Sequence, residues 1–212
     1  MWLSQAIGEA SKRSGDPAAA EPIIAALGDE NRWVRQAAAR ALYYLDDVRA
    51  VEALIGMLGD DYAPARYWAA ASLGELGDPR AEEPLISALG DGDAAVREAA
   101  AAALGKIKTR GSGEDLESAL KDESWEVREA AVGALGRIGE PRHTEAVAAA
   151  LEDERVFVRM QAAEALEKIG PAAGKREQPS ARKPVRHAAL VVMIVLGLVV
   201  VFACAHCGSA GF

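Results

Sequence analysis

Residues 91–105 read DGDAAVREAAAAALG, and this pattern of residue types recurs every 31 residues along the chain. Each copy has an aspartate, an arginine six residues later and a leucine seven residues after the arginine. The residues in register are Asp29, Asp60, Asp91, Asp122 and Asp153; Arg35, Arg66, Arg97, Arg128 and Arg159; and Leu42, Leu73, Leu104, Leu135 and Leu166. A fixed period of this length indicates a solenoid, in which each unit buries its apolar surface against its neighbours. The sequence therefore predicts a repeat domain over residues 1–170, with residues 1–28 as an atypical first copy.

Each unit contains two segments with helical patterning. In residues 32–45, apolar residues such as Val34, Ala38 and Leu45 recur at the spacing of one helix face. Gly77 follows the next such segment, where a helix commonly ends, and Pro79 falls in the first turn of the helix after it. The expected first helices are 32–45, 63–76, 94–107, 125–138 and 156–169, and the expected second helices are 18–27, 48–58, 80–89, 113–120 and 142–151. We therefore predict an all-α fold.

The units resemble HEAT repeats of the short type named after phycobilisome lyases. The resemblance rests on residues 97–105, Arg-Glu-Ala-Ala-Ala-Ala-Ala-Leu-Gly, and on the connector at residues 77–81, Gly-Asp-Pro-Arg-Ala. It covers about residues 1–170, although residues 108–113 replace the connector with Lys-Thr-Arg-Gly-Ser-Gly, which predicts a shorter second helix or a looser loop there. The resemblance implies a right-handed superhelical solenoid of about six 31-residue, two-helix repeats.

The aspartate and arginine of each unit have a structural interpretation. An aspartate just before a helix can accept hydrogen bonds from the free N–H groups of the first turn. Its carboxylate can also pair with the arginine of its own unit or of a neighbouring unit. We therefore predict a ladder of ion pairs along the stack rather than a catalytic or ligand-binding role.

The last unit has a first helix at 156–169 and no second helix after it. On this basis Ala162, Ala165, Leu166 and Ile169 should have an incompletely covered side. Packing of the following linker, self-association or a partner are the three ways to cover that side, and the sequence does not choose between them.

The C-terminal region predicts a membrane anchor. Residues 171–187 form a basic, proline-containing linker, and residues 188–205 are eighteen consecutive uncharged residues. As a helix this segment would span about 27 Å, close to the ~30 Å hydrocarbon core of a bilayer. The alternative is a buried helix that completes the solenoid. Because the basic flank precedes the segment, we expect a single-pass, C-terminally anchored membrane protein with a cytoplasmic repeat domain and a short tail, 206–212.

Charge and side-chain chemistry exclude several functions. Without residues 175–187 the chain has 19 basic and 31 acidic residues, so nucleic acid is not an expected partner. The histidines His143, His187 and His206 share no unit or helix face, and we expect no cofactor, no metal and no enzymatic activity. Cys204 and Cys207 are interpreted as small residues at the end of a membrane helix, with palmitoylation or metal binding as alternatives.

A protein-binding face is more evident. The family resemblance implies that partners bind on the outward face of the first helices. The predicted face comprises Arg32, Trp33, Gln36, Arg40 and Tyr44 in one unit, Pro64, Tyr67, Trp68 and Glu75 in the next, and a sparser patch of Trp125, Phe157 and Met160. Independently, Trp33, Arg40 and Tyr44 follow one helix stripe opposite the core, and interface hot spots favour aromatic residues and arginine. The alternative is that some of these rings pack between units.

These patterns predict a membrane-tethered scaffold or adaptor that binds a protein partner on the first helices. The alternative, from the resemblance alone, is a bilin lyase or lyase-like subunit acting on a chromoprotein. A third hypothesis is that the membrane span assembles or regulates a membrane complex, and that the solenoid only docks this complex.

Overall fold

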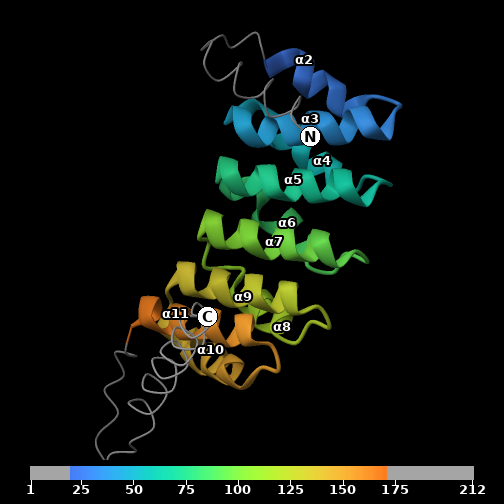
Figure 1. Cartoon of the computed structure of the whole chain (residues 1–212). Coiled ribbons are helices and arrows are strands. Elements are labelled where there is room, and N and C mark those ends of the chain that lie inside the picture. Colours follow the sequence, from blue (N-terminus) through green and yellow to red (C-terminus); the bar gives the residue numbers. More distant parts are fainter. Residues whose placement is uncertain (1–19, 171–212) are drawn as a thin grey trace, which may run out of the picture. The chain divides into compact units, whose positions relative to one another are not determined.

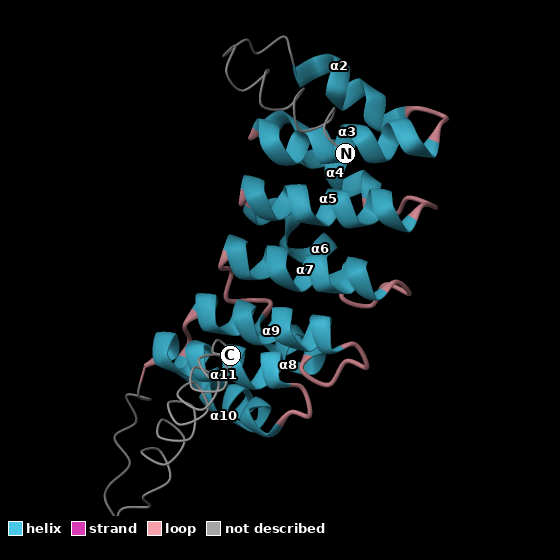
Figure 2. Ribbon diagram, viewed as in Figure 1, coloured by secondary structure: helices cyan, strands magenta, loops and turns pink. Residues whose placement is uncertain are grey.

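A computed structural model describes residues 20–170, which all lie in one compact unit, Met1–Ala173. These residues form helices joined by loops, as Figures 1 and 2 show, so the predicted all-α fold is confirmed for them. No helix within residues 20–170 is long and apolar enough to cross a membrane. The predicted linker 171–187, span 188–205 and tail 206–212, with Cys204 and Cys207, lie outside the described residues, as do residues 1–19.

The helices alternate between a long and a short type. The long helices, which are the predicted first helices, are α3 (Arg32–Leu45), α5 (Ala63–Leu76), α7 (Ala94–Ile107), α9 (Trp125–Ile138) and α11 (Val156–Ile169). The short helices are α2 (Ala20–Ala25), α4 (Val51–Met57), α6 (Glu82–Ala88), α8 (Gly113–Ala119) and α10 (Thr144–Ala149). All five long helices have the predicted bounds. The short helices cover less than predicted because turns of 3₁₀ helix, such as Pro79–Ala81, take up part of the expected ranges.

Each short helix packs against the long helix that follows it in the chain, so the pairs are α2/α3, α4/α5, α6/α7, α8/α9 and α10/α11. The long helices also pack on one another in sequence order, which forms a row along the stack (Figure 1). Leucines in register fill the space between the helices, among them Leu73 and Leu104 on the long helices and Leu85 and Leu116 on the short ones, all fully buried. Five packed pairs therefore lie within residues 20–170, and a sixth would involve residues outside them.

The expectation of an uncovered side on Ala162, Ala165 and Ile169 is wrong. Both alanines are 0% exposed and Ile169 is 7% exposed, because α11 packs on α9 and α10. Leu166, the fourth residue of the prediction, is only partly buried. The exposed residues of α11 include Ala163 and Glu167. Self-association through this helix stays a prediction.

The long helices approach one another closely through glycine. Gly74, Gly105 and Gly136 hold the same register, and a Cβ atom at any of them would lie within 2.8 Å of an alanine on the next long helix. Only a residue without a side chain allows this approach. In α3 the same register is occupied by Tyr43, and in α11 by Glu167.

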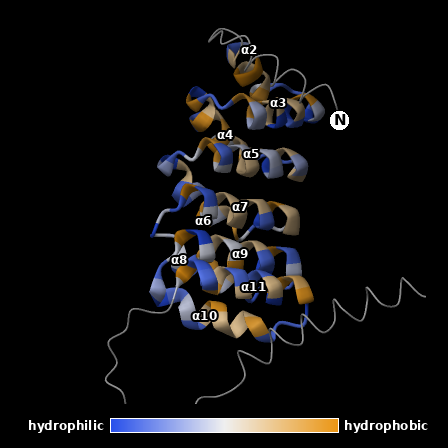
Figure 3. Ribbon diagram, turned by 60° about the vertical axis from the view of Figure 1, so that its left-hand side comes forward, coloured by the Kyte–Doolittle hydropathy of each residue, from blue (hydrophilic) through white to orange (hydrophobic). Residues whose placement is uncertain are grey.

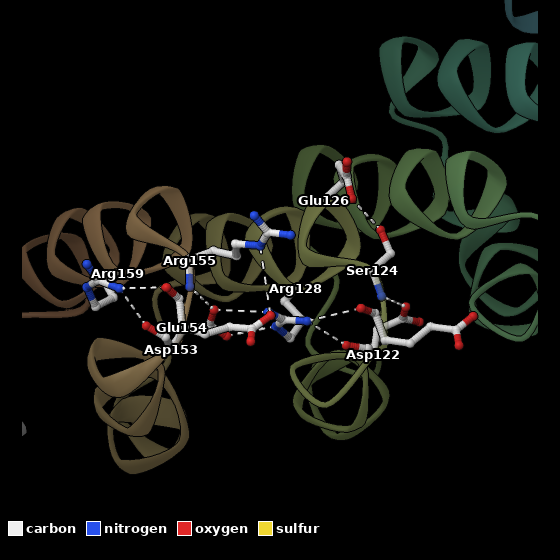
Figure 4. A network of polar contacts seen from close by, with 9 residues as sticks. Asp122, Ser124, Glu126, Arg128, Asp153, Glu154, Arg155 and Arg159 are labelled. Atoms are coloured by element: carbon white, nitrogen blue, oxygen red, sulfur yellow. Dashed lines mark hydrogen bonds and ion pairs between the residues drawn. The ribbon is translucent and has the colours of Figure 1, made fainter.

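The predicted ladder of ion pairs is present between successive units. Four of the five arginines donate through Nε and Nη2 to both carboxylate oxygens of the next unit's aspartate. The Nε–Oδ2 distances are 2.6–2.7 Å for Arg35–Asp60, Arg66–Asp91, Arg97–Asp122 and Arg128–Asp153. Nη1 donates to the backbone carbonyl of the aspartate in its own unit, as Arg128 does to Asp122 at 2.9 Å (Figure 4). Bidentate pairing of this kind is strong and directional.

The predicted capping role of these aspartates is wrong in its detail. Asp122 accepts from the N–H of Ser124 at 2.8 Å, and Ser124 is itself the N-cap of α9. The aspartate therefore stabilises the turn before the helix and does not cap the N–H groups of the first helical turn. The facing guanidinium lowers the pKa of Asp60, Asp91, Asp122 and Asp153, so these carboxylates are held in the charged form.

Candidate functional site

The long helices present side chains that the core and the ladder do not use. All four tyrosines of the chain lie between residues 43 and 67, on or just before the long helices α3 and α5. Figure 3 shows that hydrophobic and hydrophilic residues alternate along these helices.

The first cluster lies at the N-terminal end of α3. Trp33 is 63% exposed, and its ring meets Tyr62 edge to face with centroids 5.1 Å apart. The guanidinium of Arg32 stands 5.4 Å from the Tyr62 ring centroid, in cation–π contact. This cluster therefore offers an exposed indole held in place by a second ring and a cation.

The second cluster forms a groove across α3, α5 and α7. Trp68 contacts Tyr43 and Tyr67 edge to face at 5.8 and 5.2 Å, and Tyr43 contacts Tyr44 at 5.1 Å. We call this feature the aromatic groove; its volume is about 230 Å³, and it is lined by Tyr43, Tyr44, Tyr67, Trp68, Ala71, Ala99, Ala102, Ala103 and Lys106. Its lining consists of four aromatic residues from α3 and α5, four alanines from α5 and α7, and Lys106.

Charged side chains around the aromatic groove are themselves engaged. Lys106 pairs with Glu75 and lies 5.7 Å from the Tyr43 ring, while Arg40 lies 5.1 Å from the Trp68 ring. The pKa of Tyr43 is raised to about 12. The largest cause is the hydrogen bond from its hydroxyl to Glu75, and the second is burial. Glu75 thus binds both a tyrosine and a lysine and fixes one wall of the groove.

Three carboxylates occupy the neighbouring part of the surface, on α7 and α9. Burial first, and then the charges of Glu126 and Glu129, raise the pKa of Glu98. Glu98 lies four residues before Ala102 and eight before Lys106, which both line the groove, so the three residues share one face of α7. Burial, and after it the charge of Glu98, raises the pKa of Tyr67. Within residues 20–170, no lysine or arginine forms an ion pair with Glu98 or Glu129.

The third cluster lies on α9 and α11. Trp125 and Phe157 stack with centroids 5.6 Å apart and an interplanar angle of 29°. Phe157 is 55% exposed, and Met160, one turn further on, is 64% exposed. This cluster is smaller than the aromatic groove but more open to solvent.

The structure divides the predicted face into these three clusters. It brings Arg40, Tyr44, Tyr67, Trp68 and Glu75 together at the groove, places Arg32 and Trp33 at the first cluster, and Trp125, Phe157 and Met160 at the third. Gln36 and Pro64 are partly buried and belong to none of them. The alternative that rings pack between units also holds in part, because Tyr67, Trp68 and Trp125 pack against the core.

Sequence reasoning missed Tyr43 and Tyr62, and it gave Lys106 no role in partner binding. The signal for Tyr43 was present, since it replaces the glycine at which other long helices approach one another. Tyr62 precedes α5 and was outside the helical stripe, and Lys106 reaches the groove only because α7 packs on α5.

The described residues offer little for metal or cofactor chemistry. No group of three or more His, Cys, Asp or Glu residues within 20–170 is arranged to hold a metal ion. His143 is 1% exposed and its Nδ1 lies 2.6 Å from Oε1 of Glu117, a contact that joins α8 to the start of α10. A second cavity, of about 400 Å³ between α8 and α10, is lined mainly by glutamates and alanines.

Comparison with known families identifies the repeat. A model described as HEAT repeats matches residues 3–73, 58–123 and 113–191, which is most of the chain. The chain belongs to the HEAT repeat family. No curated protein sequence matches this HEAT repeat chain.

Solved structures similar to this HEAT repeat chain include a natural lyase and designed proteins. The complex of CpcE and CpcF of phycocyanin lyase from Nostoc sp. PCC7120 is 30% identical, with a TM-score of 0.66, over 71% of this chain and 64% of that chain. This chain therefore spans less than two thirds of that lyase chain. A designed armadillo repeat protein in complex with the peptide (KR)4 is 20% identical, with a TM-score of 0.63 over 79% and 90% of the two chains, and shows the fold alone.

Proposed function

We propose that this HEAT repeat protein is a scaffold or adaptor that binds a protein partner on the three clusters of the long helices and performs no chemistry of its own. The observation that carries the proposal is the exposure of Trp33, Phe157 and Met160, which are 63%, 55% and 64% exposed on one row of helices. Exposed aromatic residues beside arginine are typical of interface hot spots. The HEAT and armadillo-type fold supports the same function.

We propose further that residues 188–205 tether the repeat domain to a membrane as a single-pass C-terminal anchor, with the repeats in the cytoplasm. Support comes from the eighteen uncharged residues and the basic segment before them. Deletion of 188–205 should move the protein from the membrane pellet to the supernatant. If the deletion variant still pellets with membranes, the anchor is excluded.

The binding face is tested by affinity capture with the full chain and with a Trp33/Tyr67/Trp68→Ala variant. We expect one partner to be captured by the native chain and lost with the variant. The control is Val48→Ala, which alters an exposed apolar residue in the turn Val48–Ala50, outside the three clusters. Circular dichroism must show equal helicity for all forms. Capture of the same proteins by both chains would exclude the aromatic residues as the binding site.

The second candidate function is that of a bilin lyase or lyase-like subunit. The 30% identity to the phycocyanin lyase complex favours it. Under this hypothesis the purified chain, incubated with a bilin, should change the bilin's visible absorbance. An unchanged spectrum, alone and with a chromoprotein acceptor present, would exclude this function and leave the scaffold proposal.

A further inference from the structure

The aromatic groove and the carboxylates beside it have opposite preferences for a ligand. The groove is walled by Tyr43, Tyr67 and Trp68 and floored by alanines, so it favours an apolar or aromatic side chain. Its volume of about 230 Å³ suits one large side chain rather than a whole small-molecule ligand. The site is therefore suited to anchor one side chain of a longer ligand.

The electrostatic balance of the surface is uneven. The cations near the groove are engaged, Lys106 with Glu75 and Arg40 with the Trp68 ring. Glu98 and Glu129, in contrast, have no cationic partner within residues 20–170. Glu98 is partly buried and lies on the same face of α7 as Ala102 and Lys106, which line the groove. The carboxylates of Glu126 and Glu129 repel the charge of the partly buried Glu98. A cation placed against Glu98 would offset this repulsion, so binding of a basic side chain there is favoured.

We propose that the occupant is a peptide segment of the protein partner which inserts an aromatic or large aliphatic side chain into the aromatic groove and places an arginine or lysine against Glu98. This inference rests on the proposed scaffold function and specifies the chemistry of the partner. Glu98 lies one helical turn, about 6 Å, before Ala102 of the groove lining, and an extended peptide covers that distance in about two residues. The anchor and the cation are therefore about two residues apart in the peptide.

The groove exists because α3 departs from the repeat. In α5, α7 and α9 the glycine register lets the next helix contact the backbone. Tyr43 at this register instead stands against Trp68, 5.8 Å away, and forms a wall. At the α9–α11 contact the corresponding space is filled, since Gln161 lies over Gly133. The anchor pocket thus belongs to the N-terminal part of the described stack.

The test is selection from a displayed library of random 12-residue peptides on the immobilised full chain. We expect enriched peptides to carry an aromatic or large aliphatic residue and an arginine or lysine about two residues away. Fluorescence anisotropy then measures the best peptide and its Arg/Lys→Gln form. Glu98→Gln should weaken the basic peptide about fivefold and leave the glutamine form unchanged. Glu145→Gln, an exposed carboxylate on α10, is the matched control and should change neither.

The outcomes separate this inference from the scaffold proposal. Enriched peptides without a basic residue, or equal effects of Glu98→Gln on both peptide forms, overturn the cation assignment while peptide binding itself stands. Ala102→Trp fills the groove and should abolish binding; if that variant and the Trp33/Tyr67/Trp68→Ala variant bind every selected peptide normally, the face itself is excluded. A selection that enriches no peptide overturns the inference. The Arg/Lys→Gln comparison uses native protein, so it is decisive even if a variant folds poorly.

Discussion

The contact between α7 and α9 and the contact between α3 and α5 are built from the same register, but they differ at the glycine and the alanine positions. At α7–α9, Gly105 lies directly against Ala134, and the two helices meet backbone to side chain. At α3–α5, Tyr43 takes the glycine position and Ser72 takes the alanine position, with its Oγ donating to the Ala39 carbonyl at 2.8 Å. A regular repeat contact leaves no room for a ligand, whereas one substituted register position creates a wall and a groove.

The largest effect is expected where the regular contact is broken. A Cβ atom at Gly105 would lie 2.6 Å from Cα of Ala134, so Gly105→Val should overpack the contact and lower the free energy of unfolding by about 3 kcal/mol. Urea denaturation followed by circular dichroism measures the loss. Gly56→Ala in α4 is the matched control, since nothing lies within 4 Å of a Cβ atom there; it should stabilise by about 0.5–1 kcal/mol. A stable Gly105→Val variant would show that the contact is not close-packed.

The second effect tests the ladder that both regions share. Arg97→Gln should cost about 2 kcal/mol, because it leaves the carboxylate of Asp122, 13% exposed, without its bidentate partner. Arg159→Gln is the control at the end of the ladder. Position 184, where the next aspartate would stand, is proline, and Arg159 donates only to the backbone carbonyls of Asp153 and Glu154 within the described residues. The loss of Arg159 should cost about 1 kcal/mol. Equal losses of stability in Arg97→Gln and Arg159→Gln would contradict a stabilising role for the ion pair between units.

The ladder also predicts a dependence of stability on pH. Its aspartates have a lowered pKa in the folded chain, so their contribution is fully present above the unfolded pKa of about 4 and is lost as the pH falls through the lower, folded value. Urea midpoints should therefore be steady from about pH 7 to 5 and decline below about pH 4. Arg97→Gln should show a shallower decline than the native chain. An identical acid profile for the two proteins would assign the loss to other carboxylates.

The smallest effect concerns the wall of the aromatic groove. Tyr43→Phe removes the hydrogen bond to Glu75 and should cost about 1 kcal/mol at neutral pH. Because the pKa of Tyr43 is raised to about 12, its contribution is present below pH 10 and is lost as the pH rises towards 12. Ultraviolet titration should show that the last tyrosine to ionise is missing in the variant. Tyr44→Phe is the control, and its titration should keep that late step.

Much of the fold follows from the sequence because the information is local and periodic. The bounds of the long helices follow from apolar spacing and from C-terminal glycines, which depend only on nearby residues. The pairing of Arg97 with Asp122 follows from the 31-residue period, which places one arginine and one aspartate at each boundary between units. The prediction that the aspartates cap the helices is wrong. Whether such a side chain reaches the first helical turn or the turn before it depends on the backbone path of the loop, which the sequence pattern does not give.

The sequence by itself determined a HEAT repeat stack, its long helices and the residues that carry ion pairs from unit to unit. Only the tertiary structure decided that α11 packs on both α9 and α10, which buries Ala162 and Ala165, and that the aromatic residues separate into three clusters. It also decided that Tyr43, Lys106 and Trp68 meet at one groove. The reason is that these contacts join residues of different units, and their distance depends on how closely neighbouring helices approach.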